Sequence, residues 1–153
     1  MGELVNHVVQ DLHRFTARAS GVEGKKPDQT DEGDDGVGAY QNAADALLQA
    51  WRSDGALDRT MELPFGPVPA RWFVGQHLAD IVVHGWDLAM ATGQPTEFDP
   101  DLVQTALEWA RQNLRPELRG DSFGAEVPVP DDAPIEDRLV GFFGRDPGWS
   151  GAG

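Results

Sequence analysis

The chain has 153 residues, enough for one domain with its own hydrophobic core. Twelve Lys and Arg stand against 26 Asp and Glu, and the formal net charge of -14 repels nucleic-acid backbones and anionic lipid headgroups. The absence of cysteine excludes disulfides, thiolate metal ligands and a cysteine nucleophile. Because the sequence has no export signal and no apolar run long enough to span a bilayer, we expect a cytoplasmic protein that binds neither nucleic acid nor membrane.

The first half of the chain predicts two amphipathic helices. Apolar residues recur at helical spacing over residues 3–19. Residues 22–38 are polar and acidic without periodicity, which predicts a long surface loop. A second helix is expected over residues 39–52, and its apolar face consists of Ala43, Ala44, Leu47, Leu48 and Trp51. Residues 56–70 contain three prolines and favour a short hairpin or an extended crossover over a helix.

The second half begins with the most apolar helix of the chain, expected over residues 70–92 and closed by Gly93 in the usual C-terminal position. Apolar residues surround this helix, which indicates a central, buried element. They are Trp72, Phe73, Ile81, Val82, Val83, Trp86, Leu88, Met90 and Ala91. Asp99 and Pro100 supply the N-cap and first position of a fourth helix that extends to about residue 115.

A Pro-rich tail follows the fourth helix. One short helix is expected near residues 135–143, and Phe123, Val127 and Val129 are expected to hold the tail across the bundle. The sequence has no internal repeat and no domain boundary, so residues 1–153 are expected to form a single domain. The predicted fold is all-α: a four-helix bundle with a long acidic loop and a Pro-rich C-terminal tail ending in a short helix.

Four ionisable residues share one face of the helix predicted at residues 70–92. His77, Asp80, His84 and Asp87 are 3, 4 and 3 residues apart, so they fall within an arc of about 80°. A carboxylate and an imidazole four residues apart can reach a common ion from adjacent turns. The alternative is a structural Asp80–His84 ion pair, which in isolation is the commoner role of such residues.

A metal site would need a third ligand, and the two other histidines both lie on the first predicted helix. His13 points away from the apolar face and is expected at the surface. His7 lies at the edge of that face with Asp11 one turn later, so it either faces inward or pairs with Asp11 at the surface. The spacing leaves both arrangements open.

Four segments resemble the short actinobacterial branch of the DinB-like superfamily, which includes the mycothiol-dependent maleylpyruvate isomerases and thiol transferases. They are LVNHVV at residues 4–9, DIVVHGWDLAMATGQP at 80–95, FGAEVPVPDDAP at 123–134 and GFFGRDP at 141–147. The resemblance covers nearly the whole chain. It implies a helical bundle in which His7, Asp80 and His84 hold a divalent ion, with water in the remaining positions.

Three departures from the family pattern limit this resemblance. Members of the branch usually begin with a further helix, whereas the sequence here starts only a few residues before His7. We therefore expect either a truncated chain or a second subunit of a homodimer that covers the exposed surface. The acidic ligand of the isomerases resembles a glutamate, and Asp80 is one methylene shorter. The extra C-terminal region of the isomerases, with its substrate-binding basic residues, has no counterpart here, which argues against maleylpyruvate as the substrate.

The resemblance implies a thiol-dependent transferase or isomerase that acts on a small molecule, with mycothiol as a possible co-substrate. Three protein ligands leave open positions on the ion, where a water or thiol loses its proton near neutral pH. Zinc is the first choice, and nickel, manganese or iron also suit His and carboxylate ligands. Asp87 is a candidate for orienting a ligand histidine or a bound water, and His77 for an extra ligand or a base. For both residues, helix capping or packing is the alternative.

Two other classes of function stay open at this stage. The protein could bind a metal without catalysis, as an accessory dimer, or it could be a metal-free helical domain in which Asp80 and His84 only pair. Other cofactors are not indicated, because the sequence has no Walker or dinucleotide-binding glycine pattern and no Gly-x-Ser-x-Gly nucleophile turn.

Overall fold

The structure is a computed structural model that describes residues 2–21, 36–63, 66–114, 119 and 123–149. This part of the chain is mostly helical, with five α-helices, one short 3-10 helix and a two-stranded sheet. The predicted helical class is therefore confirmed, while the four-helix arrangement and the single domain stay predictions. The chain divides into two compact units, the N-terminal unit (residues 1–74) and the C-terminal unit (residues 75–153). No helix in the described ranges is long and apolar enough to cross a membrane.

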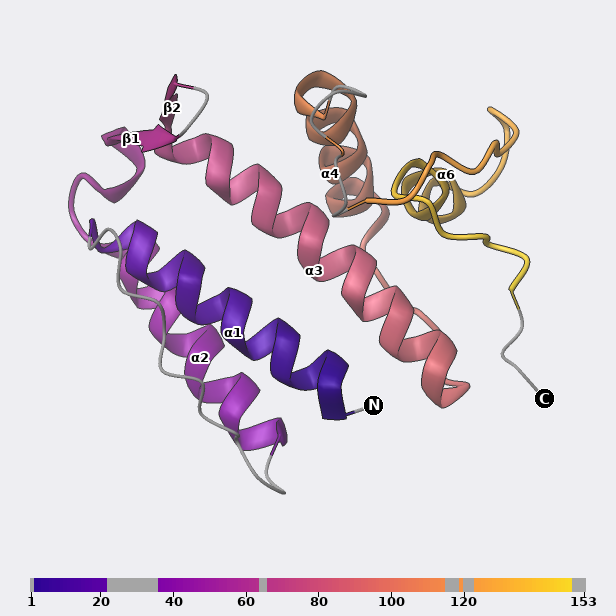
Figure 1. The fold of residues 1–153 in the computed structure, drawn as a ribbon, viewed down its shortest axis with the longest axis horizontal. Helices are drawn as coiled ribbons and strands as arrows, with labels where there is room; N and C mark the ends of the chain where they lie inside the picture. The colour runs from indigo at the N-terminus through magenta and orange to yellow at the C-terminus, as the bar shows by residue number, and fades with distance from the viewer. Residues whose placement is uncertain (1, 22–35, 64–65, 115–118, 120–122, 150–153) are drawn as a thin grey trace. The chain divides into compact units, whose positions relative to one another are not determined.

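Two parallel helices form most of the N-terminal unit. Helix α1 (Gly2–Ala19) and helix α2 (Gly36–Arg52) lie side by side (Figure 1). They run in the same direction, since Gly36 at the start of α2 meets Val5 near the start of α1. Their predicted apolar faces supply the buried residues Val9, Leu12, Phe15, Ala19, Ala43 and Leu47.

Two details of α2 differ from the sequence prediction. Residues 36–38, predicted as the end of the acidic loop, form the first turn of α2. The sequence did not indicate this turn, because Gly36 and Gly38 have low helix propensity. The rest of the predicted loop lies outside the described residues. Leu48 was predicted on the buried face but is 49% exposed, because it is rotated by about 100° from the buried Leu47.

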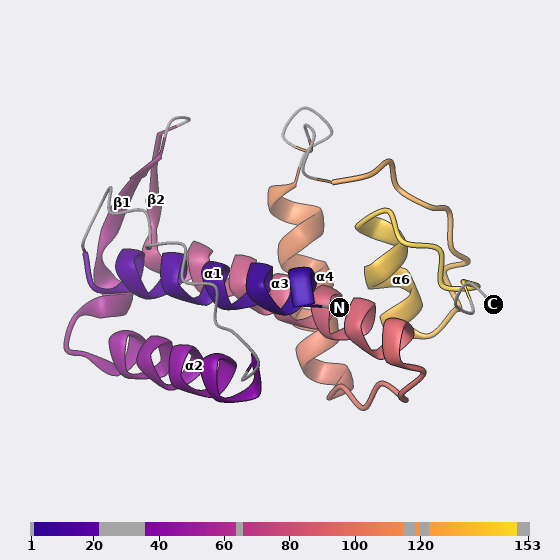
Figure 2. The ribbon, with the colours of Figure 1, turned by 60° about the horizontal axis from the view of Figure 1, so that its bottom comes forward.

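A β-hairpin follows a short 3-10 helix, η1 (Ala56–Asp58), and resolves the ambiguity at residues 56–70. Strand β1 (Thr60–Leu63) pairs antiparallel with strand β2 (Gly66–Pro69) (Figure 2). In this register Met61 lies opposite Val68. Met61 is buried in the core of the N-terminal unit, and Val68 packs against the same core. Just before β1, Arg59 donates a hydrogen bond of 2.7 Å from Nη1 to the carbonyl oxygen of Ala19 at the end of α1.

Helix α3 (Ala70–Thr92) has the predicted bounds, and Gly93 follows it with a φ of 65°. Its first residues, Ala70 and Phe73, belong to the core of the N-terminal unit. Beyond residue 74 its buried residues are Ala79, Val82, Val83, Trp86 and Ala89. The prediction that apolar residues are buried all round this helix is wrong for Leu88 and Ala91, which are exposed. An apolar residue shows what a helix can bury, but the covering side chains must come from other elements.

Helices α4 (Pro100–Asn113) and α6 (Ile135–Phe142) complete the core of the C-terminal unit and agree with the predicted segments to within two residues. The Asp99 carboxylate accepts a hydrogen bond of 2.9 Å from the backbone N–H of Asp101, which confirms the predicted N-cap. The core joins α3, α4 and α6 through Ala79, Val82, Val83, Val103, Ala106, Leu107, Ala110, Leu139, Phe142 and Phe143.

The tail that precedes α6 packs back on that helix (Figure 2), while its predicted path across a four-helix bundle stays a prediction. The ring of Phe123 meets that of Phe143 edge to face, with 5.4 Å between centroids. The backbone N–H of Val127 donates to the carbonyl oxygen of Gly141 at 2.9 Å. Val129 occupies the space that a Cβ atom on Gly141 would need, so a glycine is required where tail and helix meet.

Candidate functional site

The imidazole of His84 lies between two carboxylates of its own helix. Its Nδ1 is 3.2 Å from Oδ2 of Asp87, three residues later, and its Nε2 is 3.5 Å from Oδ1 of Asp80, four residues earlier. The ring is 15% exposed, and the side chains of Asp80 and Asp87 are 27% and 21% exposed. The helical period thus brings three of the four predicted polar residues together. His77, the fourth, is partly buried one turn before Asp80.

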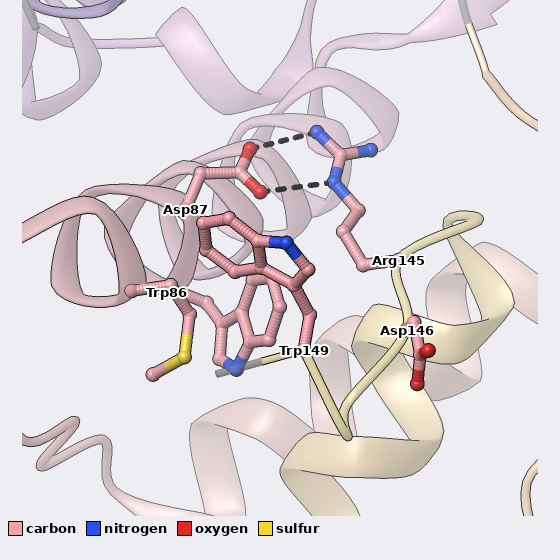
Figure 3. A pocket seen from close by; sticks show the side chains of 6 residues that line it. Trp86, Asp87, Arg145, Asp146 and Trp149 are labelled. Atoms are coloured by element: carbon pink, nitrogen blue, oxygen red, sulfur yellow. Dashed lines mark hydrogen bonds and ion pairs between the residues drawn. The ribbon is translucent and has the colours of Figure 1, made fainter. Parts of the chain in front are cut away.

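Arg145, from the segment after α6, connects this group to the C-terminal tail. Its Nε lies 3.1 Å from Oδ1 of Asp87 and its Nη2 lies 2.8 Å from Oδ2, so one guanidinium grips both carboxylate oxygens (Figure 3). The sequence prediction missed this residue. The available signal was the segment GFFGRDP, which contributed to the family resemblance without a role for its arginine.

These contacts shift the pKa values of both partners. The hydrogen bond with Asp87 raises the pKa of His84; burial opposes this, and the negative charge of Asp80 reinforces it. Burial alone would raise the pKa of Asp87, but its hydrogen bonds with His84 and Arg145 outweigh burial, and the net shift is downward. The Asp87 carboxylate therefore stays ionised beside Nδ1 of His84.

A pocket of about 300 Å³ lies beside the Asp87–Arg145 pair (Figure 3). Its lining residues are Trp86, Asp87, Met90, Arg145, Asp146 and Trp149. Two indoles and a thioether make much of the wall apolar, and the two charges of the Asp87–Arg145 pair neutralise each other. Trp86, predicted as a core residue, is buried and also faces this pocket. The volume is at the lower end of the range for small-molecule sites.

A second His–Asp pair with the same spacing occurs in α1. Nε2 of His7 is 3.2 Å from Oδ2 of Asp11, whose other oxygen accepts a hydrogen bond of 2.6 Å from Arg14. The side chain of His7 is 48% exposed, whereas that of Asp11 is 14% exposed. His13, predicted at the surface, is partly buried instead, because it flanks the apolar face of α1.

The spacing within each pair suits a divalent ion as well as a plain ion pair. Two ligands that each lie about 2.1 Å from one tetrahedral ion are about 3.4 Å apart. The Asp80–His84 and His7–Asp11 separations, 3.5 and 3.2 Å, bracket that value. In addition, the hydrogen bond at Nδ1 of His84 leaves Nε2 on the side of Asp80. The donor set therefore fits zinc or another divalent ion that takes His and carboxylate ligands.

The described part of the chain is thus a helical protein with two His–carboxylate pairs, whose nitrogen and oxygen atoms are donor types that divalent ions accept. The chain belongs to the family described as "Mycothiol maleylpyruvate isomerase N-terminal domain", a member of the DinB-like superfamily, and the family model matches residues 2–89. That range contains both His–Asp pairs, whereas Arg145 lies outside it.

Two curated relatives, both uncharacterized proteins of Mycobacterium tuberculosis, are each 40% identical to this chain over 111 residues. The matched region makes up 71% of this chain but 61% of each relative, so the chain spans less than two thirds of their length. No solved structure matches the chain.

Proposed function

We propose that this protein binds a divalent metal ion through His7, Asp80 and His84 and uses it in a thiol-dependent transfer or isomerisation of a small molecule. The observation that carries the proposal is the state of His84. Its Nδ1 is engaged by Asp87, and its Nε2 is separated from the Asp80 carboxylate by the distance expected for two ligands of one ion. Membership in the isomerase-related family supports the same conclusion.

The third ligand is proposed from α1. Helical metalloproteins build such sites from His and carboxylate side chains that facing helices contribute. His7 is the candidate because it is paired with a carboxylate at the same spacing as His84 and because the family match covers both histidines. Asp11 is then available either as a further ligand or as an acceptor that orients His7.

When bound, the ion supplies a Lewis acid that lowers the pKa of a thiol or water at an open position. The protein's own residues hold the ligand His84 in place and orient the substrate. Asp87 accepts the Nδ1–H of His84 and keeps the lone pair of Nε2 available, while the pocket beside Trp86 and Trp149 accommodates an apolar part of the substrate. Zinc is our first choice of ion and mycothiol our first choice of thiol, in a cytoplasmic homodimer.

A metal-free helical domain is the second candidate function class, and one observation favours it. Each His–Asp pair forms between residues of a single helix, at distances that an ion pair alone explains. In that case Asp80 and His84 stabilise α3, and the family's metal chemistry is absent. A protein that binds metal without catalysis lies between the two candidates.

The deciding experiment is metal analysis of protein purified without a nickel column. We expect about one zinc per chain in the wild type and a loss of affinity of at least about tenfold in both His7→Ala and His84→Ala. His13→Ala is the matched control on α1 and should bind like the wild type. Wild-type protein that binds none of zinc, nickel, manganese or iron would leave the metal-free domain as the function class.

Two further outcomes refine the proposal. Full binding by His7→Ala together with weak binding by His84→Ala would remove His7 from the ligand set. Turnover of electrophiles with mycothiol by the metal-loaded wild type, absent in His84→Ala, separates the enzyme from a protein that only binds metal. A metal-loaded protein without turnover on a broad electrophile panel would favour the binding protein.

A further inference from the structure

Arg145 is not one of the proposed metal ligands, yet it contacts Asp87, the partner of the proposed ligand His84. Its guanidinium reaches Asp87 across 58 residues of sequence and makes two hydrogen bonds to one carboxylate. A two-bonded guanidinium–carboxylate pair fixes the plane of the carboxylate as well as its position, which a single contact does not. The pair is also partly shielded from water, since the side chains of Arg145 and Asp87 are 25% and 21% exposed.

We propose that Arg145 is a positioning residue that fixes the ring orientation and the tautomer of His84, acting through Asp87. The inference rests on the proposed function, because the orientation matters for His84 as a metal ligand. Oδ2 of Asp87 receives both Nη2 of Arg145 and Nδ1 of His84. With its carboxylate plane fixed by the arginine, Asp87 holds the proton of neutral His84 on Nδ1, and Nε2 keeps its lone pair.

The end of α6 explains why Arg145 is fixed in turn. The N–H of Arg145 bonds the carbonyl of Val140 at 2.9 Å, and the N–H of Gly144 bonds that of Gly141 at 2.9 Å. This is the pattern of a Schellman motif, with Gly144 in the left-handed conformation at a φ of 82°. Nη1 of Arg145 donates a hydrogen bond of 3.0 Å to the backbone carbonyl of Phe143. The ring of Phe143 is buried in the core of the C-terminal unit. The backbone at the end of α6 thus fixes the position from which the guanidinium of Arg145 reaches Asp87.

The Gly144 position tolerates no side chain, for two reasons. Its positive φ is costly for any residue with a Cβ. The backbone of Gly124 and Ala125 also lies against it, at 2.9 to 3.0 Å from where a Cβ would be. A Gly-Arg dipeptide after a short apolar helix therefore has a local explanation: the glycine makes the turn, and the arginine holds Asp87.

The test reads the tautomer of His84 directly, in metal-free protein. Long-range proton–nitrogen NMR of the histidine rings, at a pH where His84 is neutral, should show the Nδ1–H form in the wild type. We expect the ratio of Nδ1–H to Nε2–H to fall at least about fivefold in both Arg145→Gln and Arg145→Lys, because a lysine retains the charge but cannot grip two oxygens. Arg71→Lys, at an exposed ion pair with Asp58, is the control and should leave the ratio unchanged.

Zinc affinity supplies the second readout. Loss of a residue that orients a ligand histidine typically weakens metal binding about 10- to 100-fold, and we expect both Arg145 variants to fall in that range. Arg145→Lys keeps the charge beside Asp87 and serves as the folded variant if Arg145→Gln unfolds. An unchanged tautomer ratio in Arg145→Lys, or an altered ratio with wild-type zinc affinity, would overturn the positioning role. Failure of the proposed function would look different: the wild type would bind no zinc, whereas the tautomer ratio, which is measured in metal-free protein, would still respond to the Arg145 substitutions.

Discussion

Gly75 of α3 lies directly against the indole of Trp109 in α4, and a Cβ atom at residue 75 would overlap the Cδ1 and Cγ atoms of that ring. The close approach lets the two helices pack with a tryptophan between them. We expect Gly75→Ala to destabilise the protein by about 1–3 kcal/mol, because overpacking outweighs the gain of up to about 1 kcal/mol in helix propensity. Urea denaturation monitored by circular dichroism measures the difference.

The control for this substitution is Gly2→Ala at the start of α1, where a Cβ atom would meet nothing within 4 Å. This variant should match the wild type or exceed it slightly. If Gly75→Ala is as stable as Gly2→Ala, then the Trp109 ring moves aside at little cost and the close approach is not a packing requirement.

The hydrogen bond from Arg59 to the end of α1 should contribute to the stability of the N-terminal unit. Its bond to the carbonyl of Ala19 satisfies one of the acceptors that the end of α1 leaves open. Arg59→Ala should lower the free energy of unfolding by about 1.5 kcal/mol, the lower end of the range for a hydrogen bond from a charged donor. Arg71→Ala, which breaks only the exposed 3.8 Å contact with Asp58, should change it by less than about 0.5 kcal/mol. Equal effects of the two variants on urea midpoints would contradict the capping role.

The sequence predicts the local elements well and the long-range contacts poorly. Asp99, Pro100 and Gly93 mark helix ends through their own backbone and side-chain chemistry, so the bounds of α3 and α4 are predictable. The grouping of Asp80, His84 and Asp87 is likewise a consequence of the helical period alone. Each of these predictions depends on residues that are close in sequence.

Arg145 could not be found in this way, because its partner is 58 residues distant and nothing near it in the sequence indicates that partner. The exposure of Leu48 and Leu88 has the same cause, since periodicity identifies the apolar side chain but not the element that covers it. His7 is the intermediate case. The sequence left two alternatives for His7, pairing with Asp11 or facing inward, and the structure shows the pair with Asp11. Whether His7 also binds a metal depends on contacts beyond α1, which the sequence of this helix does not predict.

The raised pKa of His84 predicts how stability depends on pH in the metal-free protein. A pKa raised above the unfolded value of 6.5 means that the folded state holds the proton more tightly. The stabilising contribution is therefore fully present below about pH 6.5 and is lost as pH rises through the folded pKa. The unfolding free energy of the wild type minus that of His84→Gln should therefore decrease as the pH rises from below 6.5 through the folded pKa of His84. A difference that is constant over this range would show that the hydrogen bond with Asp87 does not favour the charged ring.

Metal binding at Asp80 can be detected through stability, without an activity assay. A ligand that binds only the folded state, present at 100 times its dissociation constant, raises the free energy of unfolding by about 2.7 kcal/mol. We expect zinc to stabilise the wild type in this way, and Asp80→Asn to reduce the gain by about 1.4 kcal/mol or more at the same zinc concentration, since loss of a charged ligand costs at least about tenfold in affinity. Asp45→Asn, at an exposed position of α2, is the isosteric control. Equal zinc-induced shifts in the two variants would exclude Asp80 from the ligand set, and Asp80 would then serve only as the helical partner of His84.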